Sequence, residues 1–562
     1  MKPRIILDLL VLGTLLAGAA AAQAPHACHD AAVPDPGTLP PPPRMDGIGG
    51  AHLPVSCAPE AQPYFDQGLN LLHAFWDFEA LRAFREVVRR DPGCAMGWWG
   101  IHRALYYNRR EQGSERETAL ARAVELAGTA GAHERLYIQA AAELMVAGRS
   151  PAEARAAYIR AMEALIDRHP DDLQAQLFLA DFLRQGYEPS DGRPREGQLY
   201  SQAILRNLLA THPDDAAVHH YWIHAVENSA RPEAGLASAE ILPRLAPGSG
   251  HIAHMPGHIY YRIGDYAKAR AAFLASREID LAYQREQGIA PINNWNYVHN
   301  LDYLVGSCAE DGRYEEGLRW ADELARLPVD PTRSGSLGLG FILYGGDTAR
   351  ARLQMRYGRW DDAVHSLETL LEKPAPAGDS LAPSYHRGML AYARGMAAFG
   401  KGDAAAVQAQ IAALDALVQQ LTAATPTLGS DWYVGTAAKI LGVNLLELRG
   451  THAALSGKTD EGIAQLREAV DRERDLGYWE PPHYTRPVVE TLAEVYEKAG
   501  RWQDARDAWN ASLKLRPQNG HALRGLARAW AAEGNRDEAA KAFAAFRKAW
   551  QDADAGVREE ME

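Results

Sequence analysis

Residues 491–509 read TLAEVYEKAGRWQDARDAW, and residues 525–543 read GLARAWAAEGNRDEAAKAF. The glycines in the middle of these stretches, Gly500 and Gly534, are 34 residues apart. On both sides of each glycine the chain is rich in Ala, Leu, Glu and Arg, which favour helices. Glycine readily adopts the left-handed conformation that ends a helix. Each stretch therefore predicts two helices joined by a tight turn, repeated at a fixed period.

The same turn recurs upstream as a glycine that is followed, two positions later, by an aromatic residue. It occurs at Gly264, Gly312 and Gly358. The steps between these glycines are 48 and 46 residues, which indicates longer helices or loops than in the regular repeat. Stacked helix pairs of this size are typical of tetratricopeptide-like solenoids. The sequence predicts an all-α fold, a right-handed superhelix of about nine tetratricopeptide-like helix pairs.

Composition divides the chain into four parts. Residues 1–22 carry two basic residues before a mostly apolar run and end in small residues, which is typical of a cleavable signal peptide. Residues 23–60 are rich in Pro and Gly and indicate a linker. Residues 61–485 are the predicted solenoid with a central histidine-rich groove, and residues 486–562 are the most regular repeats and a cap. We expect an exported protein, periplasmic or secreted.

The charge balance and the motifs exclude several classes of partner and reaction. The chain has 59 Lys and Arg residues against 72 Asp and Glu residues, a net charge of −13, so nucleic acid is not an expected partner. After the signal peptide, no stretch approaches the roughly 18 to 20 apolar residues of a membrane span, so no stable membrane insertion is expected. A glycine-rich phosphate loop, an HExxH motif and a GxSxG motif are all missing from the sequence.

Four cysteines follow the signal peptide, Cys28, Cys57, Cys94 and Cys308, in a compartment that permits disulfides. Four cysteines allow about three complete pairings, and the sequence leaves them open. We favour Cys57 with Cys94, because each precedes the first helix of one of two consecutive repeats.

Histidines are unusually dense in the middle of the chain. They form two groups at helical spacing, His220, His224 and Glu227 at i, i+4 and i+7, and His251, His254 and His258 at i, i+3 and i+7. Residues at these spacings share one face of a helix. His220 and His254 are one 34-residue period apart, and so are His224 and His258. The first helix of one pair and the first helix of the next pair are therefore expected to direct their imidazoles into one groove.

We predict that this groove binds a divalent transition metal such as zinc, iron or copper, because neutral imidazoles with a carboxylate are common ligands of these ions. The predicted metal ligands are His220, His224, Glu227, His251, His254, His258 and His299. Two alternatives stay open. The histidines could line a ligand-binding groove without a metal, or they could form a buried ladder in which each imidazole holds the next.

Four further residues are predicted to bind a ligand in the concave groove. His73 and His102 fall on early first helices, and His219 is next to the first histidine group. Asp302 lies ten residues before Gly312, as His254 lies ten residues before Gly264. Their role is predicted from their expected place on the concave face.

These segments resemble a widespread bacterial family of exported or cytoplasmic tetratricopeptide-repeat proteins, most of them without an assigned activity. The matching motifs are Leu71-Leu72-His73-Ala74-Phe75-Trp76, Asp91-Pro92-Gly93-Cys94-Ala95-Met96, His220-Tyr221 with Ile223-His224, His254-Met255-Pro256-Gly257-His258-Ile259, Asp302-Tyr303-Leu304, Trp479-Glu480-Pro481-Pro482 and Pro517-Gln518-Asn519-Gly520. The resemblance covers almost the whole mature chain. It implies the fold and the central histidine groove, and it implies no substrate.

Two functions are compatible with these features. The first, which we favour from the sequence, is a binding scaffold whose groove captures a peptide or protein segment, with a metal ion or the histidines as its polar anchor. The second is a metal-dependent envelope enzyme, a hydrolase or oxidase, that acts at the same histidines. Metal content and its loss on chelation would distinguish them.

Overall fold

The computed structural model describes residues 39–105, 113–328, 340–374, 381–425, 432–484 and 486–561. The predicted signal peptide and Cys28 lie outside these residues. Helices make up nearly all the regular structure of the described ranges, and the only β feature within these ranges is an isolated bridge between Tyr187 and Pro194. The predicted all-α fold is therefore confirmed.

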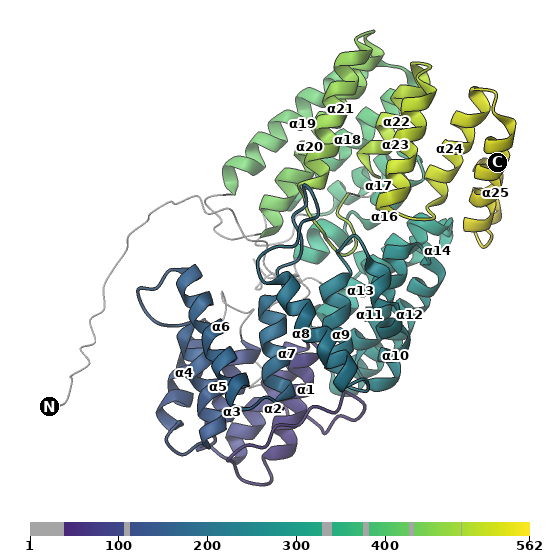
Figure 1. Ribbon diagram of the computed structural model, residues 1–562. Coiled ribbons are helices and arrows are strands. Elements are labelled where there is room, and N and C mark those ends of the chain that lie inside the picture. Colours follow the sequence, from purple (N-terminus) through teal and green to yellow (C-terminus); the bar gives the residue numbers. More distant parts are fainter. Residues whose placement is uncertain are drawn as a thin grey trace.

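The first half of the array runs from α1 to α14 (Figure 1). Its helices are α1 Gln62–His73, α2 Asp77–Arg90, α3 Ala95–Ala104, α4 Gly113–Leu126, α5 Ala132–Glu143, α6 Pro151–Arg168, α7 Leu173–Leu183, α8 Gln198–Thr211, α9 Ala216–Val226, α10 Leu236–Leu245, α11 Gly250–Ile263, α12 Tyr266–Gln287, α13 Trp295–Asp311 and α14 Tyr314–Ala325.

The second half begins with η5 and continues to α26. Its elements are the π-helix η5 Phe341–Gly346, α16 Ala349–Arg356, α17 Trp360–Glu372, α18 Ala382–Lys401, α19 Ala404–Ala424, α20 Trp432–Leu455, α21 Thr459–Arg474, α22 Val488–Lys498, α23 Trp502–Leu515, α24 Gly520–Ala532, α25 Arg536–Ala549 and α26 Ala555–Met561.

Successive helices pack in pairs, and each pair packs on the next. Within the described ranges the pairs are α1–α2, α3–α4, α5–α6, α7–α8, α9–α10, α11–α12, α13–α14, α16–α17, α18–α19, α20–α21, α22–α23 and α24–α25, which makes twelve. The count exceeds the nine expected from the turn glycines. The difference arises because pairs such as α7–α8 and α9–α10 are joined by long connections, 184–197 and 227–235, without the glycine and aromatic pattern.

The tight turns follow the predicted mechanism. Gly264 and Gly312, which end α11 and α13, have φ values of +84° and +83°. A residue with a Cβ is strained in this left-handed region, whereas glycine is not. The turn glycines therefore stop the first helix of each pair and let the second fold back on it.

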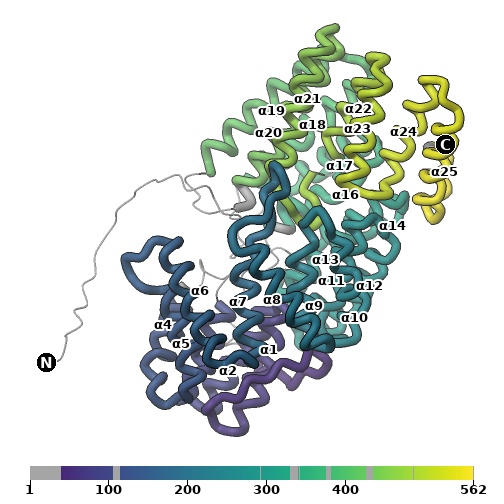
Figure 2. The backbone as a smooth tube through the Cα atoms, viewed as in Figure 1, coloured from purple at the N-terminus to yellow at the C-terminus, as the bar shows by residue number. Residues whose placement is uncertain are grey.

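The array is wound so closely that helix pairs far apart in the sequence contact one another. Figure 1 and Figure 2 show the N-terminal pairs in purple and blue at one end, and the C-terminal pairs in green and yellow at the other. Helix α1 contacts α9, four pairs further on, and α13 contacts α24. Helices α1 and α13, which are first helices of their pairs, are thus packed in part against distant repeats.

Residues 39–60 contain no helix, as their prolines and glycines predict, but they pack on the array. The side chain of Asn70 on α1 bonds to both the backbone N–H and the carbonyl of Ala51. The side chain of Glu134 on α5 accepts hydrogen bonds from Ser56. The apolar side chains of Ile48 and Leu53 join the core. This segment is therefore part of the folded N-terminal region and not a separate linker.

A disulfide joins Cys57 to Cys94, as favoured from the sequence, and Cys308 is a buried free thiol. The linked residues are 37 apart in sequence. Closing a loop of this length is expected to stabilise the folded state by about 3–4 kcal/mol, mainly by restricting the unfolded chain.

We expect the double substitution Cys57→Ser and Cys94→Ser to lower the local unfolding free energy of α1 and α2 by about 3–4 kcal/mol. Amide hydrogen exchange in these two helices measures it, and the amides of α20 and α21 are the internal reference. Unchanged exchange in α1 and α2 would contradict the prediction.

Candidate functional site

Three adjacent first helices, α9, α11 and α13, carry the central histidines. Each of these helices begins at a side-chain cap: Asp215 accepts from the backbone N–H of Val218, Ser249 from that of Ile252, and Asn294 from that of Tyr297. Caps of this kind bond the first free N–H groups and set where the helix starts. The starts of the three helices determine which of their residues face one another.

Six histidines meet in the space between these helices, and we call them the histidine cluster: His220, His224, His251, His254, His258 and His299. Neighbouring rings lie 4.6–6.0 Å apart between centroids. All six side chains belong to residues that are at most 3% exposed. The sequence-based expectation that three helices bring their imidazoles together agrees with this arrangement.

The Nδ1 atoms of two histidines point at acceptors whose identity is certain. The backbone carbonyl of His73, at the end of α1, lies 2.6 Å from Nδ1 of His220. The Oδ1 atom of Asn300 lies 2.7 Å from Nδ1 of His254, and the amide nitrogen of Asn300 donates to the carbonyl of Phe273. Because carbonyl oxygens only accept, both Nδ1 atoms carry the hydrogen.

Nδ1 of His251 also faces a carbonyl-type oxygen, as those of His220 and His254 do. Its Nδ1 lies 3.1 Å from Oδ1 of Asn296. The amide nitrogen of Asn296 is turned the other way, where it donates to Asp280 at 2.6 Å and to Ser276 at 3.2 Å. The amide oxygen therefore faces His251, and Nδ1 of His251 donates to it.

Glu227 holds two histidines at once. Its Oε1 atom lies 2.7 Å from Nδ1 of His224, and its Oε2 atom lies 2.5 Å from Nδ1 of His258. Glu227 is fully buried. A carboxylate that accepts from Nδ1 leaves Nε2 as the lone-pair nitrogen of a neutral imidazole and orients the ring, as is common around metal-bound histidines.

As a result, the Nε2 lone pairs of His220, His251 and His254 point into the cluster. The Nε2 atoms of His220 and His251 are 3.2 Å apart, and those of His254 and His258 are 2.6 Å apart. The two lone pairs of His220 and His251, 3.2 Å apart, repel unless a cation lies between them. The cation is a proton or a metal ion.

The ligand atoms gather in three overlapping groups, within each of which they lie within 4.8 Å of one another. The groups are His220 with His224 and His251, His254 with His258 and His299, and His224 with Glu227 and Glu480. Metal–nitrogen bonds of ~2.0–2.1 Å place neighbouring tetrahedral ligands about 3.3–3.4 Å apart. The 3.2 Å between His220 and His251 fits this edge, and the His254–His258 pair would need to open slightly.

Glu480 is a member of the site that sequence reasoning did not place there. Its Oε2 atom lies 3.5 Å from Nδ1 of His258 and 4.0 Å from Nε2 of His299. It comes from the connection between α21 and α22, more than 180 residues after His299 in the chain. The only signal in the sequence was a Glu-Pro-Pro segment, which shows no helical spacing with the histidines.

Burial determines the charge of most rings. It lowers the pKa of His251 and of His299 to about 3, and it lowers the pKa of His220 and His254 well below the usual value. Burial alone also lowers the pKa of His258, but the carboxylates of Glu480 and Glu227 outweigh it and raise this pKa above its usual value. Neutral imidazoles are the form that binds metal ions.

The four residues that were predicted to bind a ligand in the groove lie elsewhere. His73 bonds to Tyr221 and Gln174, and the ring of His102 bonds to the carbonyl of Arg116. His219 points away from the cluster, to Ser238 and the carbonyl of Pro213. Asp302 pairs with Arg352 at 2.7 Å. In the described structure these four side chains bond to protein groups outside the histidine cluster.

The expectation that the histidines line an open groove is corrected by the structure. The histidine cluster is enclosed, with Phe75 from the α1–α2 turn on one side and Trp295, Phe273 and Tyr303 on others. The interior is closed because α1 packs on α9, which brings together residues about 150 positions apart. Spacing along one helix cannot show such a contact.

Comparisons with known proteins identify one family along part of the chain. The tetratricopeptide repeat model matches residues 491–554, which contain both of the regular turn glycines. These residues are tetratricopeptide repeats, and the other helix pairs share their arrangement. No curated protein matches the chain.

Two solved structures are similar in their helical arrangement. The crystal structure of the APC/C hetero-tetramer Cut9-Hcn1 is 15% identical, with 87% of this chain and 78% of that chain covered and a TM-score of 0.34. The human IFIT1 dimer with PPP-AAAA is 14% identical, with 80% and 90% covered and a TM-score of 0.32. TM-scores this low do not establish a common superhelix.

Proposed function

We propose that the histidine cluster binds two transition-metal ions, one in each imidazole triad, and that the protein is a metal-dependent enzyme of the cell envelope. The observation that carries the proposal is the pairing of Nε2 atoms. The Nδ1 atoms of His220, His251 and His254 donate to acceptors around the cluster. The Nε2 lone pairs of the three histidines therefore converge inside a buried space. This is the arrangement that a metal ion stabilises.

A purely structural ladder of histidines would look different. In such a ladder each ring donates from one nitrogen and accepts at the other, so donors alternate with acceptors. Here the Nε2 atoms of His220 and His251 both lack a hydrogen, because both Nδ1 atoms donate outward. Burying groups that repel costs stability, and a bound cation removes that cost.

The donor set suits zinc, copper, iron or nickel, which accept neutral imidazole. An ion with three imidazole ligands keeps an open position and supplies Lewis acidity or redox chemistry there. Glu480 lies beside both His258 and His299 and is the carboxylate placed to exchange a proton with a bound substrate. The chain thus contributes ligands, their orientation, a proton acceptor and exclusion of water.

A scaffold that binds a peptide or protein segment is the second candidate. The tetratricopeptide repeats at residues 491–554 favour it, since such repeats form extended binding surfaces. The enclosed imidazoles are not available as anchors for a peptide. Any protein partner would therefore bind on the outer or end surfaces of the array.

The envelope location is supported by two features. The first 22 residues have the charge and hydrophobicity of a signal peptide. The disulfide between Cys57 and Cys94 suits an oxidising compartment. Within the described ranges, no helix is long and apolar enough to cross a membrane.

The test is the metal content of untagged protein purified from the periplasm, measured by elemental analysis before and after chelation. We expect about two equivalents of transition metal per chain, and about one in the His220→Ala variant. His219→Ala is the matched control, because the neighbouring histidine faces Ser238 outside the cluster. Metal-free protein that also fails to take up zinc or copper would refute the proposal.

A further inference from the structure

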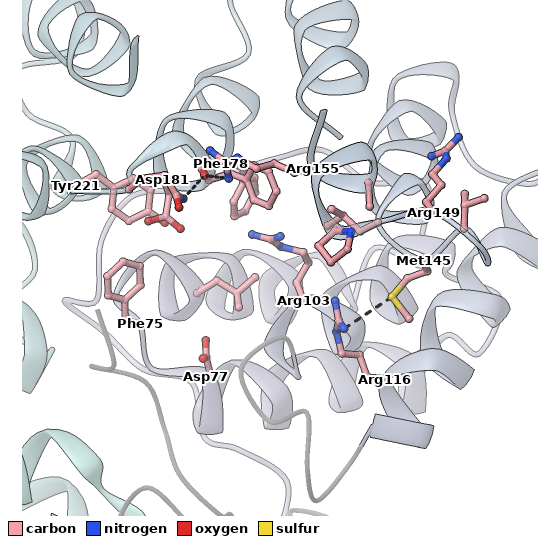
Figure 3. A pocket seen from close by; sticks show the side chains of 17 residues that line it. Phe75, Asp77, Arg103, Arg116, Met145, Arg149, Arg155, Phe178, Asp181 and Tyr221 are labelled. Carbon is pink, nitrogen blue, oxygen red and sulfur yellow. Dashed lines mark hydrogen bonds between the residues drawn. The ribbon is translucent and has the colours of Figure 1, made fainter. Parts of the chain in front are cut away.

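A cavity of about 470 Å³ lies next to the histidine cluster, between the early helix pairs. Figure 3 shows it from close by, with Phe75 and Tyr221 at one end and Arg149 at the other. We call it the arginine cavity, after its lining residues Arg103, Arg116, Arg149 and Arg155. A volume of this size holds a small organic molecule and not a folded or extended peptide.

The cavity is rich in positive charge. Besides its four arginines, the described lining has two acidic residues, Asp77 and Asp181, and one of the arginines, Arg149, forms an ion pair with Glu143. Asp181 is paired at 2.8 Å with Arg184, a buried residue that does not line the cavity. Burial raises the pKa of Asp77 to about 7, so this carboxyl is partly neutral at neutral pH. The cavity therefore favours an anion.

The rest of the lining is apolar and aromatic. The guanidinium group of Arg103 lies over the ring of Phe178, 4.9 Å from its centroid, and that of Arg155 lies over Phe182 at the same distance. Stacking holds guanidinium planes in place with less loss of entropy on binding. Leu72 and Met145 add apolar surface. A ligand that matches this lining has an anionic group and an apolar body.

Phe75 forms the wall between the arginine cavity and the metal-binding triad. It lines the cavity, and its ring centroid is also 4.6 Å from that of His220, 5.2 Å from that of His224 and 5.9 Å from that of His251. Its backbone is in the left-handed region, with φ of +51°. Such a conformation costs a bulky residue about 1–2 kcal/mol and is common near functional sites.

We infer that the arginine cavity binds a small organic anion with an apolar body, and that this body lies against Phe75 beside the His220–His224–His251 triad. The inference goes beyond the proposed function, because Phe75 lies between the anion and the histidines of the triad. Binding of the anion itself does not depend on a metal. The two proposals can therefore fail separately.

The test uses two fluorescent probes on metal-free protein. Anilinonaphthalene sulfonate is an anion with an aromatic body, and N-phenyl-1-naphthylamine is its neutral counterpart. We expect saturable binding of the anionic probe with one site per chain. Replacing Arg103 by Met should weaken it about tenfold and change the affinity for the neutral probe less than about twofold.

Three further variants make the result decisive. Arg103→Lys keeps a positive charge and should restore part of the affinity, and Arg155→Met should repeat the loss if Arg103→Met does not fold. Arg122→Met removes an arginine that pairs with Glu125 outside the cavity, and it should change nothing. Absence of saturable binding, or equal losses for the anionic and neutral probes, would overturn the inference.

The position beside the triad is tested by copper(II), which quenches fluorescence at short range. In copper-loaded protein we expect the bound anionic probe to lose at least about half of its emission. If copper binds and the emission is unchanged, the proposed position next to Phe75 is wrong. If no copper binds while the probe binds as described, the metal proposal fails and the anion site stands.

Discussion

Replacing Glu227 by Gln is expected to lower the metal content of the protein from about two equivalents to about one. Glu227 accepts from Nδ1 of His224 with one oxygen and from Nδ1 of His258 with the other, so it orients a ligand of each triad. Glutamine has nearly the same shape, but its amide nitrogen cannot accept a hydrogen bond. One of the two imidazoles must then take the other tautomer, with its hydrogen on Nε2.

The histidine that changes tautomer no longer presents a lone pair to the metal. Loss of a residue that hydrogen-bonds to a metal ligand typically weakens metal binding about 10- to 100-fold. Glu227 is such a residue and is fully buried. Equilibrium dialysis against zinc or copper, followed by elemental analysis, measures the change. Glu233→Gln is the control, since Glu233 is exposed and pairs with Arg231 away from the cluster. Equal metal affinity in both variants would show that Glu227 has no part in the site.

Replacing Arg356 by Met is expected to destabilise the C-terminal half of the array by about 3–5 kcal/mol. Arg356 is fully buried and bonds to Glu310 on α13 at 2.8 Å and to Glu490 on α22 at 2.6 Å. It thereby links helices whose residues lie 134 positions apart. Without the guanidinium, two buried carboxylates lose their shared partner, although Arg516 still contacts Glu310.

Denaturant unfolding followed by fluorescence measures this loss. Arg394→Met is the matched control, because Arg394 forms an ion pair with Glu368 in which both side chains are about half exposed. Exposed pairs contribute little to stability, so the control should unfold at the same denaturant concentration as the natural protein. Equal midpoints for Arg356→Met and the control would contradict the prediction.

The natural protein and the Arg356→Met variant should also differ in how their stability depends on pH. Burial alone raises the pKa of Glu490, but Arg356 outweighs it and lowers this pKa to about 2, from a usual value of 4.5. In the natural protein this carboxylate therefore stabilises the fold fully above pH 4.5, and the contribution is lost as the pH falls towards 2. In Arg356→Met the pKa of the buried Glu490 should lie above its usual value, because the guanidinium that counteracts the effect of burial on this pKa has been removed. The difference in stability between the two proteins should therefore narrow as the pH falls from 7 to about 5.

Much of the fold followed from local patterns. The 34-residue spacing of Gly500 and Gly534 predicted helix pairs, and the family match to residues 491–554 confirms it there. The turn glycines Gly264 and Gly312 have the left-handed backbone that their role requires. Pairs with long connections were undercounted, because residues 184–197 and 227–235 carry no such turn.

The histidine cluster was only partly predictable. Helical spacing and the repeat period placed the imidazoles of α9 and α11 on matching faces, since both follow from the geometry of a single helix pair. Glu480, Asn296 and the carbonyl of His73 were not foreseen as parts of the site. Asp302, by contrast, has the same spacing from its turn glycine as His254, but its carboxylate forms an ion pair with Arg352.

The sequence by itself determined the helix pairs, the turns between them and the helical faces that carry histidine, because each depends on residues within about one repeat of one another. Only the tertiary structure decided that the histidine cluster is enclosed and that Phe75 separates the histidines from the arginine cavity. It also decided which nitrogen of His220, His251 and His254 carries the hydrogen. The reason is that winding of the array accumulates small rotations over many pairs, so α1 meets α9 and residue 480 meets residue 258 without any local pattern to record the contact.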